Sequence, residues 1–254
     1  MTDPDNELSV RRVNQSGKSI KDQNRWQLWI IIAGNSLFLY GVIQGNAVKL
    51  EGMRSAFKDA ANLLPVGLAL LISVVLNGLL SAEAKARLVF LRWHHALPGH
   101  RAFTEYAIRD PRIDVSVLAK LHGSALPTDP VEQNRAWYRI YKAVETDPAV
   151  RQVHRDFLLL RDYTALCLVF IVFYGAVAFY AVSSKKVALI YLLATAAQYL
   201  LVRQAAFNYG VRFVTTVLAR SMDKEKPMVA TQTTKGSRSR RKADDESSKN
   251  PENT

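Results

Sequence analysis

Four long apolar runs, almost free of charged residues, constrain this chain most strongly. They cover residues 26–48, 63–80, 163–182 and 187–206, the last with Arg203 reaching back to the membrane surface. Because about 20 mainly apolar residues are needed to cross the hydrocarbon core of a bilayer, each run predicts a transmembrane helix. A soluble protein of 254 residues has too little other sequence to cover four such helices. The predicted fold class is an all-α integral membrane protein with four transmembrane helices.

The positive charges predict the orientation. The chain carries 34 Lys and Arg against 22 Asp and Glu, a net charge of +12. If the four runs cross the membrane, 29 of the basic residues fall on one side and five on the other. Because basic segments stay in the cytoplasm, we expect a bacterial inner-membrane protein with both termini cytoplasmic. The first run follows a polar leader and lacks a cleavage site, so we expect it to be retained rather than removed as a signal peptide.

The spacing of the runs predicts five segments. They are a disordered cytoplasmic leader (1–24), a transmembrane hairpin (25–81), a helical cytoplasmic domain (82–160), a second transmembrane hairpin with a cytoplasmic helix extension (161–222), and a disordered charged tail (223–254). Lys185 and Lys186 flank a very tight turn, which predicts that the last two runs form an antiparallel pair.

The segment between the second and third runs has a helical pattern throughout. Nothing in the pattern breaks the helix between Leu63 and Leu97, until Pro98-Gly99, which predicts that the second run continues past the membrane as a stalk helix. Asp147-Pro148 is a helix start, and it predicts a matching stalk that leads into the third run. Between the stalks we expect helices at 101–109, 114–121 and 128–145, the last with Trp137 facing inward.

The most distinctive stretch follows the first stalk. Its basic side chains predict a pocket for an anion, such as a nucleotide or a lipid headgroup. The candidate ligand-binding residues are Arg92, His95, His100, Arg101, Arg109 and Arg112. The alternative is an ordinary solvated or self-paired surface. Asp162, beside Arg161 at the inner membrane boundary, is expected to neutralise Arg203 or Arg155.

The histidines raise the alternative of a metal site. Membrane di-iron enzymes use about eight ligands in several histidine boxes, and this chain has five histidines in all, so that class is excluded. A single zinc ion held by His95, His100 and either Asp110 or Asp114 stays open as an alternative. The main prediction is no cofactor and no metal.

Motifs of catalysis are missing from the sequence. It contains no Walker A loop, no Gly-x-Ser-x-Gly and no His-Glu-x-x-His, so an enzyme is not expected. The apolar runs contain amides and hydroxyls but no carboxylate, which argues against an ion-coupled transporter. Small residues such as Gly34, Gly41 and Ala194 permit close helix packing, also between protomers. The single cysteine, Cys167, excludes a disulfide within the chain.

Two stretches carry a resemblance. Leu97-Pro-Gly-His-Arg-Ala-Phe103 and Asp110-Pro-Arg-Ile-Asp114, together with the four runs, resemble a group of uncharacterised bacterial membrane proteins of mobile or phage-defence loci. The resemblance covers most of residues 25–220 and assigns no catalytic residue. It implies that membrane perturbation in antiviral defence belongs among the hypotheses.

Three functions are therefore in view. The first is a non-enzymatic membrane effector or sensor, whose cytoplasmic domain binds a cytosolic protein or a nucleotide-like ligand and whose spans form a homo-oligomer or perturb the lipid bilayer. The alternative is a membrane scaffold or accessory subunit that recruits a cytosolic partner. The second alternative is a metal-dependent membrane enzyme. No specific nucleic-acid-binding motif is present.

Overall fold

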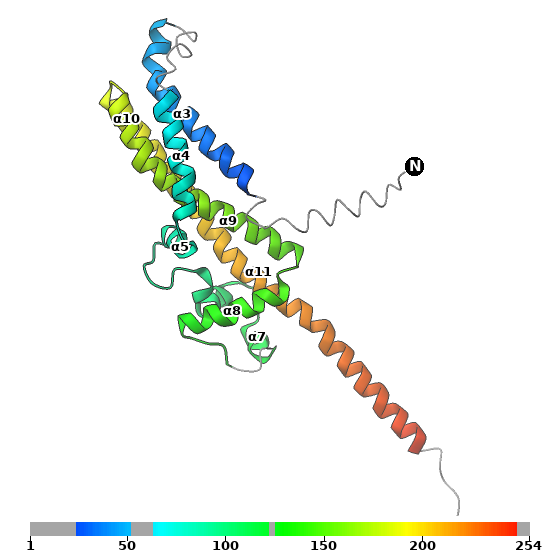
Figure 1. The fold of residues 1–254 in the computed structure, drawn as a ribbon. Coiled ribbons are helices and arrows are strands. Elements are labelled where there is room, and N and C mark those ends of the chain that lie inside the picture. The colour runs from blue at the N-terminus through cyan, green and yellow to red at the C-terminus, as the bar shows by residue number, and fades with distance from the viewer. Residues whose placement is uncertain (1–23, 52–62, 122–124, 248–254) are drawn as a thin grey trace, which may run out of the picture. The chain divides into compact units, whose positions relative to one another are not determined.

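The computed structural model describes residues 24–51, 63–121 and 125–247, and every regular element in these ranges is a helix (Figure 1). The chain divides into two compact units. Unit 1 comprises Met1–Pro98 and Arg151–Phe213, and unit 2 comprises Gly99–Val150 and Val214–Thr254. The prediction of an all-helical fold is confirmed for the described residues.

Three helical stretches of the described chain are long and apolar enough to cross a membrane. They are Arg25–Gly45, Pro148–Ala181 and Lys185–Lys224. The elements that form them are α3 (Arg25–Glu51), the run of α9 (Pro148–Val169), η5 (Phe170–Tyr174) and α10 (Gly175–Ala181), and α11 (Lys185–Ser247). The chain is thus a multipass helical protein by the length and composition of these helices.

The second apolar run forms α4 (Leu63–Leu79), which is shorter than the other three stretches. Its 17 residues rise about 25 Å at about 1.5 Å per residue, slightly less than the hydrocarbon core of about 30 Å. A fourth crossing by α4 therefore stays a prediction. Within unit 1, α3 packs against both α4 and α10 (Figure 1).

The core of unit 1 lies among these apolar helices. Phe170, Tyr174 and Tyr191 are its largest members, and each is almost fully buried. Ala178 and Ala188 lie close to the turn between α10 and α11, where Lys185 donates a hydrogen bond to the carbonyl of Phe179. The predicted antiparallel hairpin with a tight turn is confirmed, since α10 ends at Ala181 and α11 begins at Lys185.

The prediction that the second run continues as one unbroken stalk helix is wrong. The helix breaks between α4 and α5 (Ala82–Phe90), where Ser81 is extended and its Oγ accepts a hydrogen bond from the Ala84 N–H at 3.1 Å. The serine caps a new helix by satisfying one of the backbone donors that its first turn leaves unpaired. The helix then ends at Leu91, which is left-handed, well before the Leu97 that the sequence predicts.

The predicted helix that leads from Pro148 into the third run is continuous, and α5 packs against it, whereas its extension into the cytoplasm stays a prediction. The chain is helical without interruption from Pro148 to Ala181, although η5 widens it into a π-helix for one turn. The Phe90 ring of α5 lies 6.4 Å from that of Phe157 in α9 and 5.4 Å from that of Phe207 in α11. Gly210 permits this approach, because a Cβ there would come within 2.7 Å of the Phe90 ring.

Unit 2 is built from short helices and the later part of α11. Its N-terminal stretch is η3 (Pro98–Arg101), η4 (Ala102–Tyr106) and α6 (Ala107–Arg109), followed by α7 (Val115–Leu121) and α8 (Pro130–Val144). The three helices expected here are confirmed. Asp129 caps α8 by accepting from the N–H groups of Val131 and Glu132.

The core of unit 2 contains the predicted inward face of α8. Trp137 is 6% exposed, and its Nε1 donates to the carbonyl of Val214 in α11 at 3.4 Å. Val217 and Leu218 of α11 are fully buried in the same unit. The sequence offers no sign that α11 completes the domain.

In the structure, α11 is helical up to Ser247, whereas the sequence predicts disorder from Asp223. Local helix propensity does not account for this, since Pro227 and Gly236 lie inside the segment and both disfavour a helix interior. The leader up to residue 23 and the last residues from 248 onward lie outside the described residues. The predictions for these two segments stay predictions.

Candidate functional site

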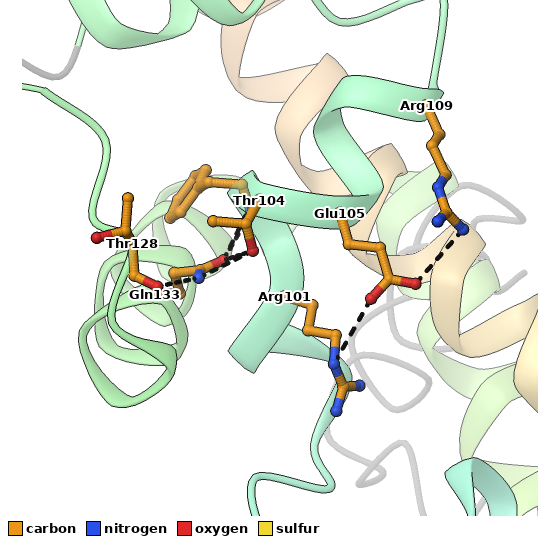
Figure 2. Close-up of polar contacts among 7 residues, drawn as sticks. Arg101, Thr104, Glu105, Arg109, Thr128 and Gln133 are labelled. Carbon is orange, nitrogen blue, oxygen red and sulfur yellow. Dashed lines mark hydrogen bonds and ion pairs between the residues drawn. The ribbon is translucent and has the colours of Figure 1, made fainter.

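The basic residues of the predicted pocket that lie in unit 2 are held by acids of the same chain. Glu105 lies between two of them, with Arg101 Nε at 3.6 Å and Arg109 Nη1 at 3.4 Å (Figure 2). These contacts follow from the four-residue spacing, which places the three side chains on one helical face. The side chain of Arg101 is 12% exposed, whereas that of Arg109 is 75% exposed. Arg101 and Glu105 thus form the inner part of the cluster, and Arg109 extends into solvent.

A buried amide fixes the helix that carries this cluster. The Gln133 side chain of α8 is 1% exposed. Its Oε1 accepts from the backbone N–H of Phe103 at 3.1 Å and of Thr104 at 3.2 Å, and its Nε2 donates to the carbonyl of Thr128 at 2.8 Å (Figure 2). These N–H groups belong to the start of η4, where a helix leaves its donors without internal partners. Gln133 therefore holds the start of η4 against α8.

Arg112 is bound by Asp110 in a two-pronged ion pair. Its Nε and Nη2 donate to the two carboxylate oxygens at 2.9 and 2.6 Å, and Nη2 also reaches Thr215 Oγ1 of α11 at 3.1 Å. The hydrogen bonds from Arg112 hold the pKa of Asp110 well below its ordinary value of 3.8. The pair raises the pKa of Arg112 in turn. Asp114 caps α7 through Ser116 and Val117, which lowers its pKa as well.

The remaining predicted ligand residues are distributed between the units. Arg92 and His95 are exposed and belong to unit 1, in the segment after α5. His100 belongs to unit 2 and is partly buried in η3. In unit 2, the structure brings Arg101, Arg109 and Arg112 to carboxylates rather than to an open anion site.

Metal-binding geometry is likewise missing from the part of the chain that the structure describes. No group of three or more His, Cys, Asp or Glu side chains is placed there to hold an ion. Asp110 and Asp114, the carboxylates considered for a zinc site, are occupied by Arg112 and by the start of α7. These contacts do not fit the alternative of a zinc ion.

Unit 2 does contain one polar hollow that sequence reasoning missed. Its volume is about 340 Å³, and it is lined by Val144, Thr146, Asp147, Arg220, Asp223 and Lys224. Arg220 lies 3.8 Å from Asp147 and 3.7 Å from Asp223, and Lys224 donates to the carbonyl of Ala143 at 2.8 Å. Both signs of charge line it, so it suits a small polar molecule or an extended peptide better than a simple anion. No signal in the sequence places α11 beside Asp147.

No protein-family model, curated protein or solved structure matches this chain. The function must therefore be inferred from the side chains of the chain itself.

Unit 1 contains two layers of polar side chains. The first lies where α5, α9 and α11 meet. Lys85 Nζ is 3.2 Å and Arg161 Nη2 is 3.0 Å from the same Asp162 oxygen, so two buried cations share one carboxylate.

Arg203 does not pair with Asp162 in this layer, which corrects the sequence-based expectation. Its Nη1 donates to the carbonyl of Val89 at 3.2 Å, and the Tyr199 hydroxyl donates to that of Leu88 at 3.1 Å. These carbonyls are at the C-terminal end of α5, where a helix leaves acceptors unpaired. The cation also suits the negative end of the helix dipole.

The second layer is a group of hydroxyls deep among the apolar helices. The Tyr174 hydroxyl lies 2.8 Å from Ser36 Oγ of α3 and 3.4 Å from Ser73 Oγ of α4, and all three residues are buried. Tyr174 is the last residue of η5, so the π-helical turn precedes the point where three helices share these bonds. Hydroxyl contacts of this kind hold membrane helices against one another.

Several glycines in α3 and α4 are not used for packing inside the chain. A Cβ added at Gly34, Gly41 or Gly45 would meet nothing within 4 Å, in contrast to Gly175, where it would meet Leu192 at 3.0 Å. Gly41 and Gly45 are four residues apart and Gly34 is seven residues earlier, so the three lie on one face of α3. Leu37 lies on the same face and is 70% exposed. We name Gly34, Leu37, Gly41 and Gly45 the glycine face.

Proposed function

We propose that this chain is a non-enzymatic membrane effector or sensor that crosses a bacterial inner membrane four times. In this proposal α4 is the fourth span, both termini are cytoplasmic, and unit 2 is the cytoplasmic domain that receives a ligand or a partner. The spans assemble with those of other copies and perturb the bilayer. The resemblance to proteins of phage-defence loci suggests infection as the setting.

The sharing of two helices between the units carries the proposal. α9 begins in unit 2 at Pro148, and its helical stretch continues through η5 and α10 to Ala181. α11 supplies both a proposed span and the buried residues Val217 and Leu218 of unit 2. A change in the packing of unit 2 therefore acts directly on two membrane helices. A scaffold has no need of this arrangement, since a single anchor would suffice.

The glycine face supports assembly. A glycine that faces lipid contributes no side-chain packing to its helix. Glycines four residues apart, in contrast, let two transmembrane backbones approach closely. Among the residues that the structure describes, nothing covers the glycine positions of this face, so a second copy of α3 has room to pack there. The polar hollow beside Asp147 and Arg220 is the best candidate in unit 2 for the molecule that controls assembly.

Cross-linking in lipid vesicles tests assembly. Leu37→Cys, in a chain that carries Cys167→Ala, is expected to form a disulfide-linked dimer on oxidation. The double variant Gly41→Leu/Gly45→Leu should lose this dimer, because the added side chains keep the backbones apart. Gly67→Leu/Gly78→Leu is the matched control, since it makes the same two substitutions at exposed glycines of α4, outside the glycine face.

Leakage tests the effector role. Wild-type chain in vesicles is expected to release a trapped dye, and in cells to lower the membrane potential, with or without phage infection. The variant Gly41→Leu/Gly45→Leu should release less dye, and the control Gly67→Leu/Gly78→Leu should match wild type. An assembled protein that causes no leakage in either setting contradicts the effector role. A stoichiometric cytosolic protein that copurifies in mild detergent would then favour a scaffold.

A further inference from the structure

The segment that follows α5 turns its apolar side chains outward. Leu91 and Trp93 are 63% and 78% exposed, although both are large and hydrophobic. The backbone is left-handed at Leu91 and again at His95, with φ of 50° and 51°. Such angles are costly for residues with a Cβ and are held where surroundings compensate for them. We name residues 91–95 the Trp93 loop.

The position of the loop along the membrane helices can be estimated from α11. Arg203 and Tyr199 hydrogen-bond to the last carbonyls of α5, so the loop begins beside this part of α11. Arg203 follows Lys185 by roughly 18 residues, which corresponds to about 27 Å at about 1.5 Å per residue. Because the hydrocarbon core is about 30 Å thick, a span that starts at Lys185 reaches the inner membrane surface at this level.

The charges at this level match that surface. Lys85 and Arg161 contact the same carboxylate of Asp162, so basic side chains gather at this level beside the loop. Arg92 and two histidines alternate with the apolar side chains of the loop itself. Tryptophan prefers the headgroup region of a bilayer, and basic residues beside it are attracted to the anionic lipids of the inner leaflet.

We propose that the Trp93 loop is an interfacial anchor that inserts Leu91 and Trp93 into the cytoplasmic leaflet beside the spans. The inference rests on the proposed crossing of the membrane by α11. It goes beyond the effector role, since it assigns a lipid-binding surface to residues that no catalytic or ligand role requires. In this proposal, the left-handed backbone at Leu91 ends α5 and directs the chain toward the bilayer.

Lipid-attached quenchers test the anchor. Trp93→Cys in the Cys167→Ala chain is labelled with an environment-sensitive fluorophore and reconstituted into vesicles of phosphatidylcholine and phosphatidylglycerol. Nitroxides placed shallow in the lipid chains are expected to quench the label at least about twofold more than deep ones, as interfacial depth requires. Leu193→Cys, on α11 near the middle of its apolar run, is the deep reference, and Tyr138→Cys of unit 2 is the reference outside the membrane.

The references separate the outcomes. If label at Leu193 is quenched most by deep nitroxides, α11 spans the bilayer, and the result at position 93 then decides the anchor by itself. Quenching at position 93 no stronger than at Tyr138 overturns the proposal. Shielding of position 93 from both lipid nitroxides and aqueous iodide also overturns it, because protein then covers the loop. Failure of deep quenching at Leu193 would instead contradict the proposed spans.

Discussion

The Nζ of Lys85 lies 3.2 Å from the Oδ1 of Asp162, and both side chains are largely buried. Arg161 contacts the same oxygen, so the carboxylate neutralises one of two cations where α5, α9 and α11 meet. Removal of the acid and removal of either base are therefore not equivalent. Asp162 is the residue that both Lys85 and Arg161 contact, so its removal affects both ion pairs.

Asp162→Asn is expected to lower the free energy of unfolding by about 3–5 kcal/mol, since it removes the carboxylate that two buried cations both contact. Lys85→Met should have a smaller effect, because Arg161 keeps its ion pair with Asp162. Thermal unfolding in detergent, followed by the loss of helical circular dichroism, measures both. Glu83→Gln is the control, because the exposed pair of Glu83 with Arg87 is worth only about 0.3–0.5 kcal/mol. Equal losses in the Asp162 and Lys85 variants would contradict the shared carboxylate.

Tyr174→Phe removes the hydroxyl that two serines share. Ser36 and Ser73 then lose a buried partner, and hydrogen bonds between membrane helices are worth about 0.6 kcal/mol on average and up to about 1.7 kcal/mol. We expect a loss of about 1–2 kcal/mol in the same unfolding measurement. Tyr180→Phe deletes the same atom from a side chain that is 93% exposed and should change nothing. Similar values for the two variants would show that the buried hydroxyl does not stabilise the bundle.

Local signals predicted much of this fold. Asp129-Pro130 and Asp147-Pro148 each mark a helix start, and α8 and α9 begin at those prolines. The start of α5 had a comparable signal, because Ser81 is followed two residues later by Glu83 in the first helical turn. The absence of Pro and Gly there outweighed the serine in the prediction of an unbroken stalk. The structure shows that the helix begins again at this serine, whose backbone is extended.

Part of the candidate site was predictable from the sequence, and part of it was not. The pairing of Arg101 and Arg109 with Glu105 follows from their four-residue spacing, so self-pairing was foreseeable from the sequence. The contacts of Lys85 with Asp162 and of Arg220 with Asp147 join residues far apart in the chain. Pairings of this kind depend on how helices pack, and no local pattern encodes them.

Gln133→Leu tests what holds η4 against α8. The leucine fills a similar volume but leaves the N–H groups of Phe103 and Thr104 without their acceptor. Each buried donor left unpaired costs about 1–3 kcal/mol, so we expect unit 2 to become the first part of the chain that a protease cleaves. Gln152→Leu is the control, since that side chain is exposed and makes only contacts within its own helix. Unchanged cleavage sites and rates in Gln133→Leu would show that η4 is held by packing alone.

Asp110 predicts how the stability of the chain depends on acid. Arg112 depresses the pKa of Asp110 in the folded chain below its ordinary value of 3.8, so the unfolded chain takes up a proton at this group first. The stability that the pair contributes is therefore fully present above about pH 4 and decreases as the pH falls toward the folded pKa. We expect Asp110→Asn to be less stable than wild type by a constant amount between pH 7 and about pH 5, and by a shrinking amount below about pH 4.

Acid titration of unfolding in detergent, on the full chain, measures this difference. Arg112→Ala is the informative partner variant, because without the guanidinium the pKa of Asp110 should return toward 3.8. In that background, Asp110→Asn should no longer change the acid dependence. A difference between wild type and Asp110→Asn that grows as the pH falls below 4 would have the wrong sign for an ion pair. It would mean that the folded chain binds the proton more readily than the unfolded chain, and that Arg112 does not hold Asp110 ionised.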